Sequence, residues 1–194
     1  GVDPKAEGDI LFNGEIVHIN SPRTAINYGL GYLPEDRKAA GLFLEMSVKL
    51  NIEATVINQV SNGLFVSPAK ERTLAETYVE QLNISTPSIQ QEERRLSGGN
   101  QQKALVAKWL SIRPKILIVD EPTRGIDVGA KKEIHFLLRS LASQGVGVIM
   151  ISSELPEILG MSDRILVMHE SAIVGEFDAM DATEEKIIRS ASGQ

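Results

Sequence analysis

One stretch decides the fold class: Ile116-Leu117-Ile118-Val119-Asp120-Glu121-Pro122-Thr123. Its four leading apolar residues are typical of a strand buried on both faces of a parallel sheet. The strand ends in two adjacent carboxylates, Asp120 and Glu121, at the edge where open α/β sheets bind their ligands. Because neighbouring side chains on a strand point to opposite sides, we expect the two acids to have different roles.

Two interpretations of this acid pair are open. In nucleotide triphosphatases an Asp at this place holds Mg²⁺, usually through water, and the neighbouring Glu orients or deprotonates the attacking water. Alternatively, Asp120 or Glu121 only caps a helix that follows the strand, by accepting backbone N–H groups. The acid pair alone does not decide between them.

The residues after the acid pair predict a βαβ unit. Apolar residues at helical spacing predict an amphipathic helix, namely Ile134, Leu137, Leu138 and Leu141. The run Val146–Ile151 then predicts a second strand, which we also expect to be buried on both faces. A membrane-spanning helix needs about 20 apolar residues, and this run of six is the most apolar in the sequence. We therefore expect no transmembrane segment.

A second informative segment lies upstream of the strand: Leu96-Ser97-Gly98-Gly99-Asn100-Gln101-Gln102-Lys103. Ser97 is a typical N-cap, and two glycines follow in the first turn, where free N–H groups point outward at the positive end of the helix dipole. Glycine there costs about 0.5–1 kcal/mol relative to alanine, so two of them indicate that something approaches the backbone closely. We interpret this turn as a preformed anion site; a flexible entry to the helix is the alternative.

Composition narrows the class of protein. A length of 194 residues predicts one large domain or a core with a smaller lobe, and a hydrophobic share of 42% is typical of globular proteins. The 20 basic and 26 acidic side chains give a net charge of −6, which argues against a nucleic-acid partner. The absence of cysteine excludes a disulfide scaffold, a thiolate nucleophile and a cysteine zinc site.

Local signals predict the remaining elements. Asn13-Gly14, within residues 9–19, is typical of a tight hairpin. Residues 42–95 show the helical spacing of a lobe, and the charge run at residues 92–95 is predicted to be a solvated loop. Further predicted elements are a helix from Ser21-Pro22 to about Gly29, strands at Leu30–Leu33, Ile165–Met168 and Ile173–Phe177, and a final helix at Glu184–Ala191.

In combination, the motifs resemble the nucleotide-binding domain of an ABC transporter over nearly the whole chain. Residues 96–103 resemble its signature motif, residues 116–121 its Walker B strand and residues 125–127 its D-loop. Three longer stretches are similar to the second half of a tandem ATPase from a bacterial sugar importer of the ribose or galactose type. They are Gly31-Tyr32-Leu33-Pro34-Glu35-Asp36-Arg37-Lys38, residues 120–131 and Ser152-Ser153-Glu154-Leu155-Pro156-Glu157.

The resemblance implies an α/β fold with a P-loop NTPase-like core, an antiparallel β hairpin and an inserted helical subdomain. Residues 1–43 and 112–194 would form the core, and residues 44–111 the helical signature subdomain. The family's phosphate loop, Gly-x-x-x-x-Gly-Lys-Ser/Thr (Walker A), does not occur in the sequence. Since the family places it just before the segment matching residues 1–7, we expect the chain to be truncated after the Walker A helix. Without that loop we expect the chain alone to bind ATP weakly and to hydrolyse it negligibly.

The resemblance also implies ATP and Mg²⁺ as cofactors and assigns roles to individual residues. Asp120 would hold the metal, and Glu121 would be catalytic. Nucleotide contacts are implied for Ser97, Gly98, Gly99, Gln101, Asp127, Glu35 and Ser153. Glu35 stands where the family usually has a glutamine, and Ser153 where it usually has a switch histidine. A serine lacks the reach and charge of an imidazole, so we expect the site around this half to be catalytically impaired.

In the family, two such domains meet head to tail, and the signature motif of one completes the ATP site of the other. The implied partners are the first ATPase half of the same tandem protein, membrane permease subunits and, indirectly, a sugar-binding protein, with no nucleic acid. The implied location is the cytoplasmic face of the cell membrane, as a peripheral subunit. Two alternatives are open. One is a soluble ABC ATPase of DNA repair or translation, which has the same signature and Walker B motifs. The other is a non-catalytic interaction module.

Overall fold

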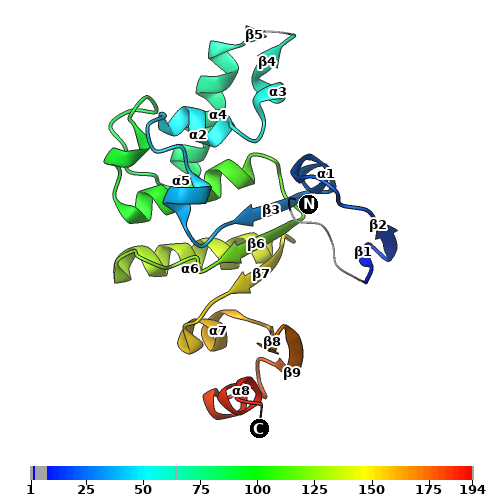
Figure 1. The fold of residues 1–194 in the computed structure, drawn as a ribbon. Coiled ribbons are helices and arrows are strands. Elements are labelled where there is room, and N and C mark those ends of the chain that lie inside the picture. The colour runs from blue at the N-terminus through cyan, green and yellow to red at the C-terminus, as the bar shows by residue number, and fades with distance from the viewer. Residues whose placement is uncertain (1, 3–7, 64, 194) are drawn as a thin grey trace.

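The centre of the fold is a three-stranded parallel sheet in the order β3 (Leu30–Leu33), β6 (Ile116–Asp120) and β7 (Gly147–Ile151). The computed structural model describes residues 2, 8–63 and 65–193, and Figure 1 shows the sheet between a helical lobe and a C-terminal unit. The core lies against β6, the middle strand, where Leu117 and Val119 are fully buried, as is Leu33 on β3. The predicted α/β class is confirmed.

Helix α6 (Val128–Ser143) connects β6 to β7 and completes the predicted βαβ unit. Asp127 caps it, because its side chain accepts a hydrogen bond from Ala130 N at 3.0 Å. One expectation was wrong: β7 is not buried on both faces. Ile149 and Ile151 are 52% and 48% exposed, since among the described residues nothing covers the outer face of this strand.

The helical lobe consists of α2 (Val48–Glu53), α3 (Ile57–Val60), α4 (Pro68–Gln81) and α5 (Gly98–Leu110). Helix α5 packs on β3 and contacts α2 and α4, so one apolar cluster joins lobe and sheet. A two-stranded hairpin in the lobe, β4 (Ser61–Asn62) and β5 (Phe65–Val66), was not predicted from the helical spacing.

The charge run at residues 92–95 differs from the prediction. Residues Glu93–Arg95 form a 3₁₀ turn, and the side chain of Glu93 is fully buried, whereas Arg94 and Arg95 are exposed. The turn is fixed by Glu93 N, which donates to Met46 O at 2.9 Å, and by Arg94 N, which donates to Leu44 O at 3.0 Å. These backbone bonds pull one acid of the run into the lobe.

The N-terminal hairpin, β1 (Ile10–Phe12) and β2 (Glu15–Val17), turns at Asn13 and Gly14, whose φ angles of 53° and 82° match the predicted tight turn. Helix α1 (Pro22–Tyr28) begins after the N-cap Ser21 and ends at Gly29, as predicted. Between it and the lobe, a single π-helical turn, Arg37–Gly41, follows β3.

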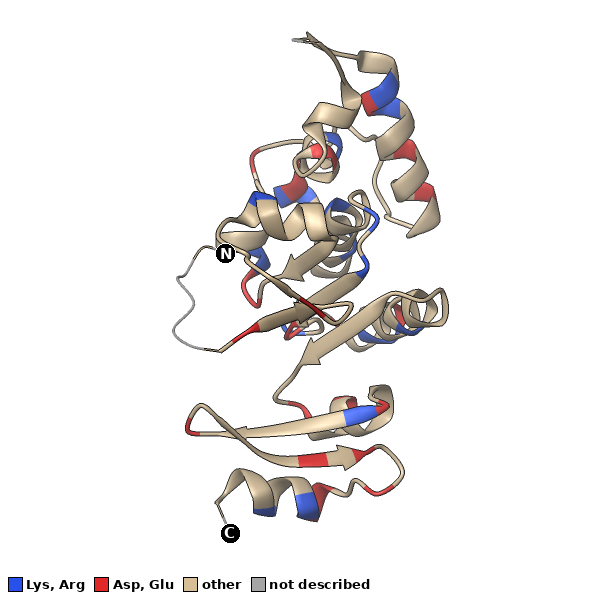
Figure 2. Cartoon of the chain, turned by 90° about the vertical axis from the view of Figure 1, so that its right-hand side faces the viewer, with Lys and Arg blue, Asp and Glu red and all other residues tan. Residues whose placement is uncertain are grey.

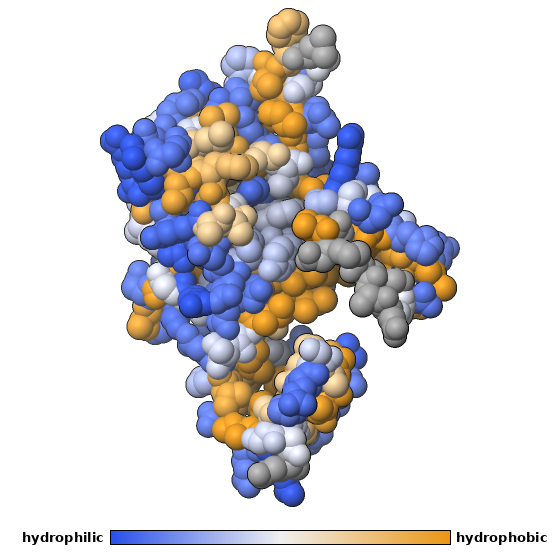
Figure 3. Space-filling model, viewed as in Figure 1, coloured by the Kyte–Doolittle hydropathy of each residue, from blue (hydrophilic) through white to orange (hydrophobic). Residues whose placement is uncertain are grey.

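The C-terminal unit contains α7 (Leu155–Met161), the antiparallel pair β8 (Arg164–His169) and β9 (Ala172–Asp178), and α8 (Glu184–Ala191). It has its own small core of Ile165, Val167 and Ile187. Figure 3 shows the surface hollowed between this unit and the rest of the molecule, with apolar residues on both sides. Among the described residues, β7 and β8 each have one strand neighbour, so both keep an open edge.

Charged residues of both signs are interspersed over the helices and loops, and the strands of the central sheet carry few of them (Figure 2). None of the described helices combines the length and apolar character needed to cross a membrane.

Candidate functional site

The two acids at the end of β6 bond to residues on opposite sides of that strand, one beside β3 and one beyond β7. Asp120 Oδ2 accepts a hydrogen bond from the Tyr32 hydroxyl, on β3, at 3.1 Å. Glu121 Oε1 accepts one from Ser153 N, just beyond β7, at 2.8 Å. Partial burial raises the pKa of Tyr32, and its hydrogen bond to Asp120 raises it further, so the phenol stays a donor.

Glu121 has an unusual backbone conformation. Its φ is 47°, in the left-handed region that a residue with a Cβ rarely adopts. Two backbone bonds hold it there: Glu121 N donates to Ile151 O at 2.8 Å, and Arg124 N donates to Glu121 O at 3.1 Å. Such a conformation costs about 1–3 kcal/mol and is common at functional sites, where surrounding structure fixes a side chain in place.

Asp120 fits a magnesium ion that is also held by phosphate. Its Oδ1 has no hydrogen-bond partner among the described residues and remains available as an oxygen ligand, and Glu121 Oε2 likewise remains available to accept from a water. The described residues contain no group of three or more His, Cys, Asp or Glu side chains that could hold a metal. Mg²⁺ is commonly bound by one or two carboxylates together with substrate phosphates and waters, which is what this donor set allows.

The N-terminus of α5 presents hydrogen-bond donors to solvent. Ser97 is exposed, and its Oγ accepts from Asn100 N at 3.4 Å and from Asn100 Nδ2 at 3.0 Å. Asn100 is itself held by Ser85 N, which donates to its Oδ1 at 2.8 Å. Since both lone pairs of the serine oxygen are engaged, its hydroxyl hydrogen is left to donate outward.

The glycines after Ser97 are required by contacts within this chain. A Cβ on Gly98 would lie 3.0 Å from Arg37 Nη2, and one on Gly99 would lie 2.6 Å from Ala130 Cβ. The close approach predicted from the two glycines is therefore made by the protein itself. The N–H groups of Gly98 and Gly99 have no acceptor among the described residues, so the first turn also keeps the donors expected at a helix start.

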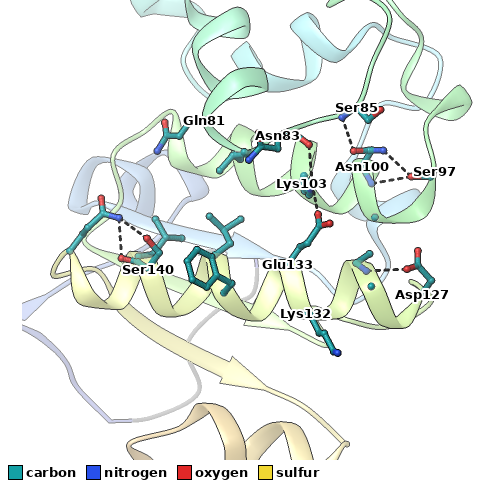
Figure 4. A pocket seen from close by; sticks show the side chains of 18 residues that line it. Gln81, Asn83, Ser85, Ser97, Asn100, Lys103, Asp127, Lys132, Glu133 and Ser140 are labelled. Atoms are coloured by element: carbon teal, nitrogen blue, oxygen red, sulfur yellow. Dashed lines mark hydrogen bonds and ion pairs between the residues drawn. The ribbon is translucent and has the colours of Figure 1, made fainter.

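A groove of about 1070 Å³ runs between α5 and α6, and Ser97, Gly99 and Asp127 lie along it. In Figure 4, Lys103 on α5 and Glu133 on α6 point toward each other across the groove, with Nζ and Oε2 2.5 Å apart. The backbone N–H of Ala130 lowers the pKa of Asp127, so this cap stays ionised. Asp120 and Glu121 do not line the groove.

Three other proposed nucleotide ligands have contacts that the sequence did not indicate. Glu35 forms an ion pair with Arg124. Ser153 contacts the acid pair through its backbone N–H. Gln101 is buried, and its Nε2 donates to Glu93 O at 3.1 Å, so it fixes the turn before α5 and does not face the groove.

Comparison with known proteins identifies the family. The ABC transporter pattern matches residues 1–124, more than half of the chain. The chain belongs to the ABC transporter family. It is 51% identical, over its full length, to a putative ribose/galactose/methyl galactoside import ATP-binding protein of Pseudomonas fluorescens. It is 53% identical, over 97% of its length, to the xylose import ATP-binding protein XylG of Thermoanaerobacter pseudethanolicus.

The chain spans 38% and 37% of the lengths of these two ABC transporter relatives. A dimeric ATP-binding cassette in a post-hydrolysis state with ADP and Pi has a similar fold, with a TM-score of 0.76. That likeness has 19% identity and covers 91% of this chain and 75% of the other. At this identity it supports the fold alone.

Three residues beside the acid pair and the first turn of α5 were not predicted as site residues from the sequence. Tyr32 and Asn100 bond to Asp120 and Ser97, and Arg37 lies against Gly98. Asn100 lies three residues after the N-cap, a spacing at which side chains often reach back to the cap, so a signal for it was present. The hydrogen bonds of Tyr32 to Asp120 and of Arg37 to Arg124 O and Gly125 O span more than 80 residues and leave no local signal.

Proposed function

We propose that this chain is part of the ATP-binding subunit of a bacterial sugar importer and that it couples ATP binding and hydrolysis to carbohydrate uptake. The observation that carries the proposal is its identity of about half, along its whole length, to proteins described as ribose/galactose and xylose import ATP-binding proteins. The proposal concerns the longer protein, because the chain spans less than two fifths of those relatives.

We infer that the exposed turn at α5 acts on a nucleotide bound by another ATPase half of the same protein. The hydroxyl of the exposed Ser97 and the N–H groups of Gly98 and Gly99 are donors without an acceptor among the described residues, and Asp127 lies beside them along the groove. Charge-assisted hydrogen bonds of this kind contribute about 1.5–3 kcal/mol each, enough to favour closure of the two halves around a γ-phosphate.

The acid pair is assigned to this half's own site. Bound ATP with Mg²⁺ would supply the phosphoryl group that is transferred to water. Asp120, oriented by Tyr32, would hold the metal, and Glu121, oriented by the backbone of Ser153, would orient the attacking water. Glu35 is engaged with Arg124, and Ser153 replaces the switch histidine, so we assign this half mainly the role of signature donor.

The isolated chain is proposed to be inactive, because nothing in its sequence forms a phosphate loop. The open edges of β7 and β8, together with the exposed Ile149 and Ile151, are where one more strand of the family's core would fit. Residues 1–43 and 112–194 remain our proposed core, and residues 44–111 the proposed signature subdomain. The proposed partners are the first ATPase half, permease subunits and indirectly a sugar-binding protein, at the cytoplasmic face of the membrane.

The test is reconstitution of the intact protein with its permease subunits in proteoliposomes, followed by ATP-driven uptake of ribose, galactose and xylose. We expect uptake of one of these sugars together with ATP hydrolysis. If none of these sugars is taken up, the proposal that the protein is a sugar importer is wrong. In parallel, the 194-residue chain alone should show negligible ATPase activity, and a turnover near that of the intact protein would contradict the role given to the missing phosphate loop.

A further inference from the structure

The guanidinium of Arg37 donates two hydrogen bonds to the loop that runs from the acid pair into the proposed D-loop, residues 125–127. Its Nη1 donates to Arg124 O at 2.9 Å, and its Nη2 donates to Gly125 O at 3.1 Å. These are the carbonyls of two consecutive residues, midway between Glu121 and Asp127. Only the planar fork of arginine offers two parallel donors for such a pair of acceptors.

The same guanidinium also lies against the signature helix. A Cβ on Gly98 would lie 3.0 Å from Arg37 Nη2 and 3.2 Å from Gly125 O, so the space beside Gly98 is occupied by both. Arg37 Nε is buried and has no acceptor in the part of the chain that the structure describes. A cation at the N-terminus of a helix faces the positive end of the dipole, so its two carbonyl bonds have to hold it there.

The segment that carries Arg37 is itself firmly fixed. Asp36 Oδ1 accepts from Lys38 N at 2.9 Å and from Ala39 N at 3.0 Å, and Leu42 N donates to Arg37 O at 2.8 Å. Lys108 of α5 donates to Gly41 O at 2.9 Å, and Glu35 forms its ion pair with Arg124. Arg37 thus reaches from a turn that is bonded to α5 of the lobe to the loop that follows β6.

We propose that Arg37 is a positioning residue that holds the D-loop in register with the signature turn, so that Asp127 and Ser97 meet the nucleotide of the other half as one surface. This inference rests on the proposed function. It assigns Arg37 no contact with nucleotide. Its effect is transmitted through the carbonyls of Arg124 and Gly125 and through its packing on Gly98.

The first test measures ATPase kinetics of the intact protein with its permease. Arg37→Ala should lower kcat about tenfold, Arg37→Lys should lower it less because an ammonium replaces only one of the two bonds, and Lys38→Ala is the control. Lys38 is the neighbouring exposed cation, and its variant should stay within twofold of wild type. Wild-type activity in Arg37→Ala would overturn the inference alone. A wild-type protein without ATPase activity would overturn the proposed function and the inference with it.

A second test separates positioning from simple destabilisation. Gly98→Ala places a methyl group 3.0 Å from Arg37 Nη2 and 3.2 Å from Gly125 O, so it should displace both and reduce kcat strongly in the wild type. In Arg37→Ala the Gly125 carbonyl is no longer held and can move away, so Gly98→Ala should add at most a twofold loss there. Losses that multiply would show that the two residues act independently and would overturn the proposal. Hydrogen exchange gives a readout without nucleotide: Arg37→Ala should speed exchange at residues 122–127 and 97–101, and unchanged exchange there would also overturn it.

Discussion

Ser153 donates its backbone N–H to Glu121 Oε1 at 2.8 Å, so the residue that we propose to stand at the family's switch-histidine position holds the carboxylate through its main chain. The side chain at position 153 is therefore free to differ without loss of this bond. The second carboxylate oxygen, Oε2, has no hydrogen-bond partner among the residues that the structure describes. The acid pair is thus well oriented even though the site around it departs from the family pattern.

The first prediction ranks two substitutions in the intact protein. Ser97→Arg should reduce ATPase activity more than Glu121→Gln does. Ser97→Arg removes the outward donor and puts a long side chain on the exposed turn, whereas Glu121→Gln keeps the Oε1 acceptor for Ser153 and affects a half that we expect to hydrolyse little. We expect a loss of at least tenfold for the first and less than threefold for the second in steady-state ATPase assays. The reverse order would show that this half is the hydrolysing one.

The second prediction concerns Asn100, which bonds to both Ser97 and Ser85. Asn100→Ala removes the Nδ2 donor to Ser97 Oγ and the acceptor of Ser85 N, so the serine hydroxyl is held only by the longer bond from the backbone N–H of residue 100. We expect a stability loss of about 1 kcal/mol and a five- to tenfold fall in ATPase activity of the intact protein. Ser85→Ala is the matched control, because Ser85 contributes a backbone N–H that the substitution retains. A control that is as impaired as Asn100→Ala would assign the loss to the Ser85 loop.

Elements with local signals were predicted well from the sequence. The turn at Asn13-Gly14, the Ser21 and Ser97 caps and the helix Glu184–Ala191 each depend on a few neighbouring residues, whose φ preferences and capping groups act wherever the chain goes. The parallel pairing of β6 with β7 followed from apolar runs separated by an amphipathic helix. These features do not depend on what surrounds them.

Features set by distant contacts were not predicted. The charge of Glu93 suggests solvent, yet the backbone bonds of its turn to Leu44 and Met46 bury it. Gln101 has a polar amide in a motif that the resemblance links to nucleotide binding. In the structure its Nε2 donates to the backbone carbonyl of Glu93 instead. Whether the outer face of β7 is buried depends on which other segment packs on it. An apolar run in the sequence does not show whether such a segment is present.

The third prediction uses the buried Glu93, whose carboxyl group has no hydrogen-bond partner within residues 2, 8–63 and 65–193. Burial raises its pKa to about 8. Because the unfolded chain ionises this group near pH 4.5, the unfolded state binds fewer protons between pH 4.5 and 8, and the group's contribution to stability is lost as pH rises through that window. Glu93→Gln removes the titration, so it should be more stable than wild type at pH 8.5 by about 2–4 kcal/mol, with the difference shrinking toward zero near pH 4.

Urea unfolding followed by the fluorescence of Trp109, the single tryptophan, measures this difference at several pH values. Glu92→Gln is the control beside it. The hydrogen bond from Arg94 lowers the pKa of Glu92, so its stabilisation is present above the usual carboxyl pKa and lost as pH falls, the opposite dependence. A Glu93→Gln difference that stays constant from pH 4 to 8.5 would show that Glu93 does not titrate in this range.

The last prediction concerns Glu157, which connects α7 to α6 and to the loop after the acid pair. Its Oε1 accepts from the Thr123 hydroxyl at 3.1 Å and lies 2.6 Å from His135 Nε2, and both Glu157 and Thr123 are buried. Glu157→Leu would leave the buried hydroxyl without a partner, so we expect a stability loss of about 2–4 kcal/mol, and about 1 kcal/mol for Glu157→Gln, which keeps an acceptor. Glu154→Leu, at the residue just before the same helix, is the control: Glu154 pairs with Lys131 at the surface, where such a pair contributes at most about 1 kcal/mol. Equal losses in the two leucine variants, measured by urea unfolding, would mean that the buried contact to Thr123 does not support the loop that follows Glu121.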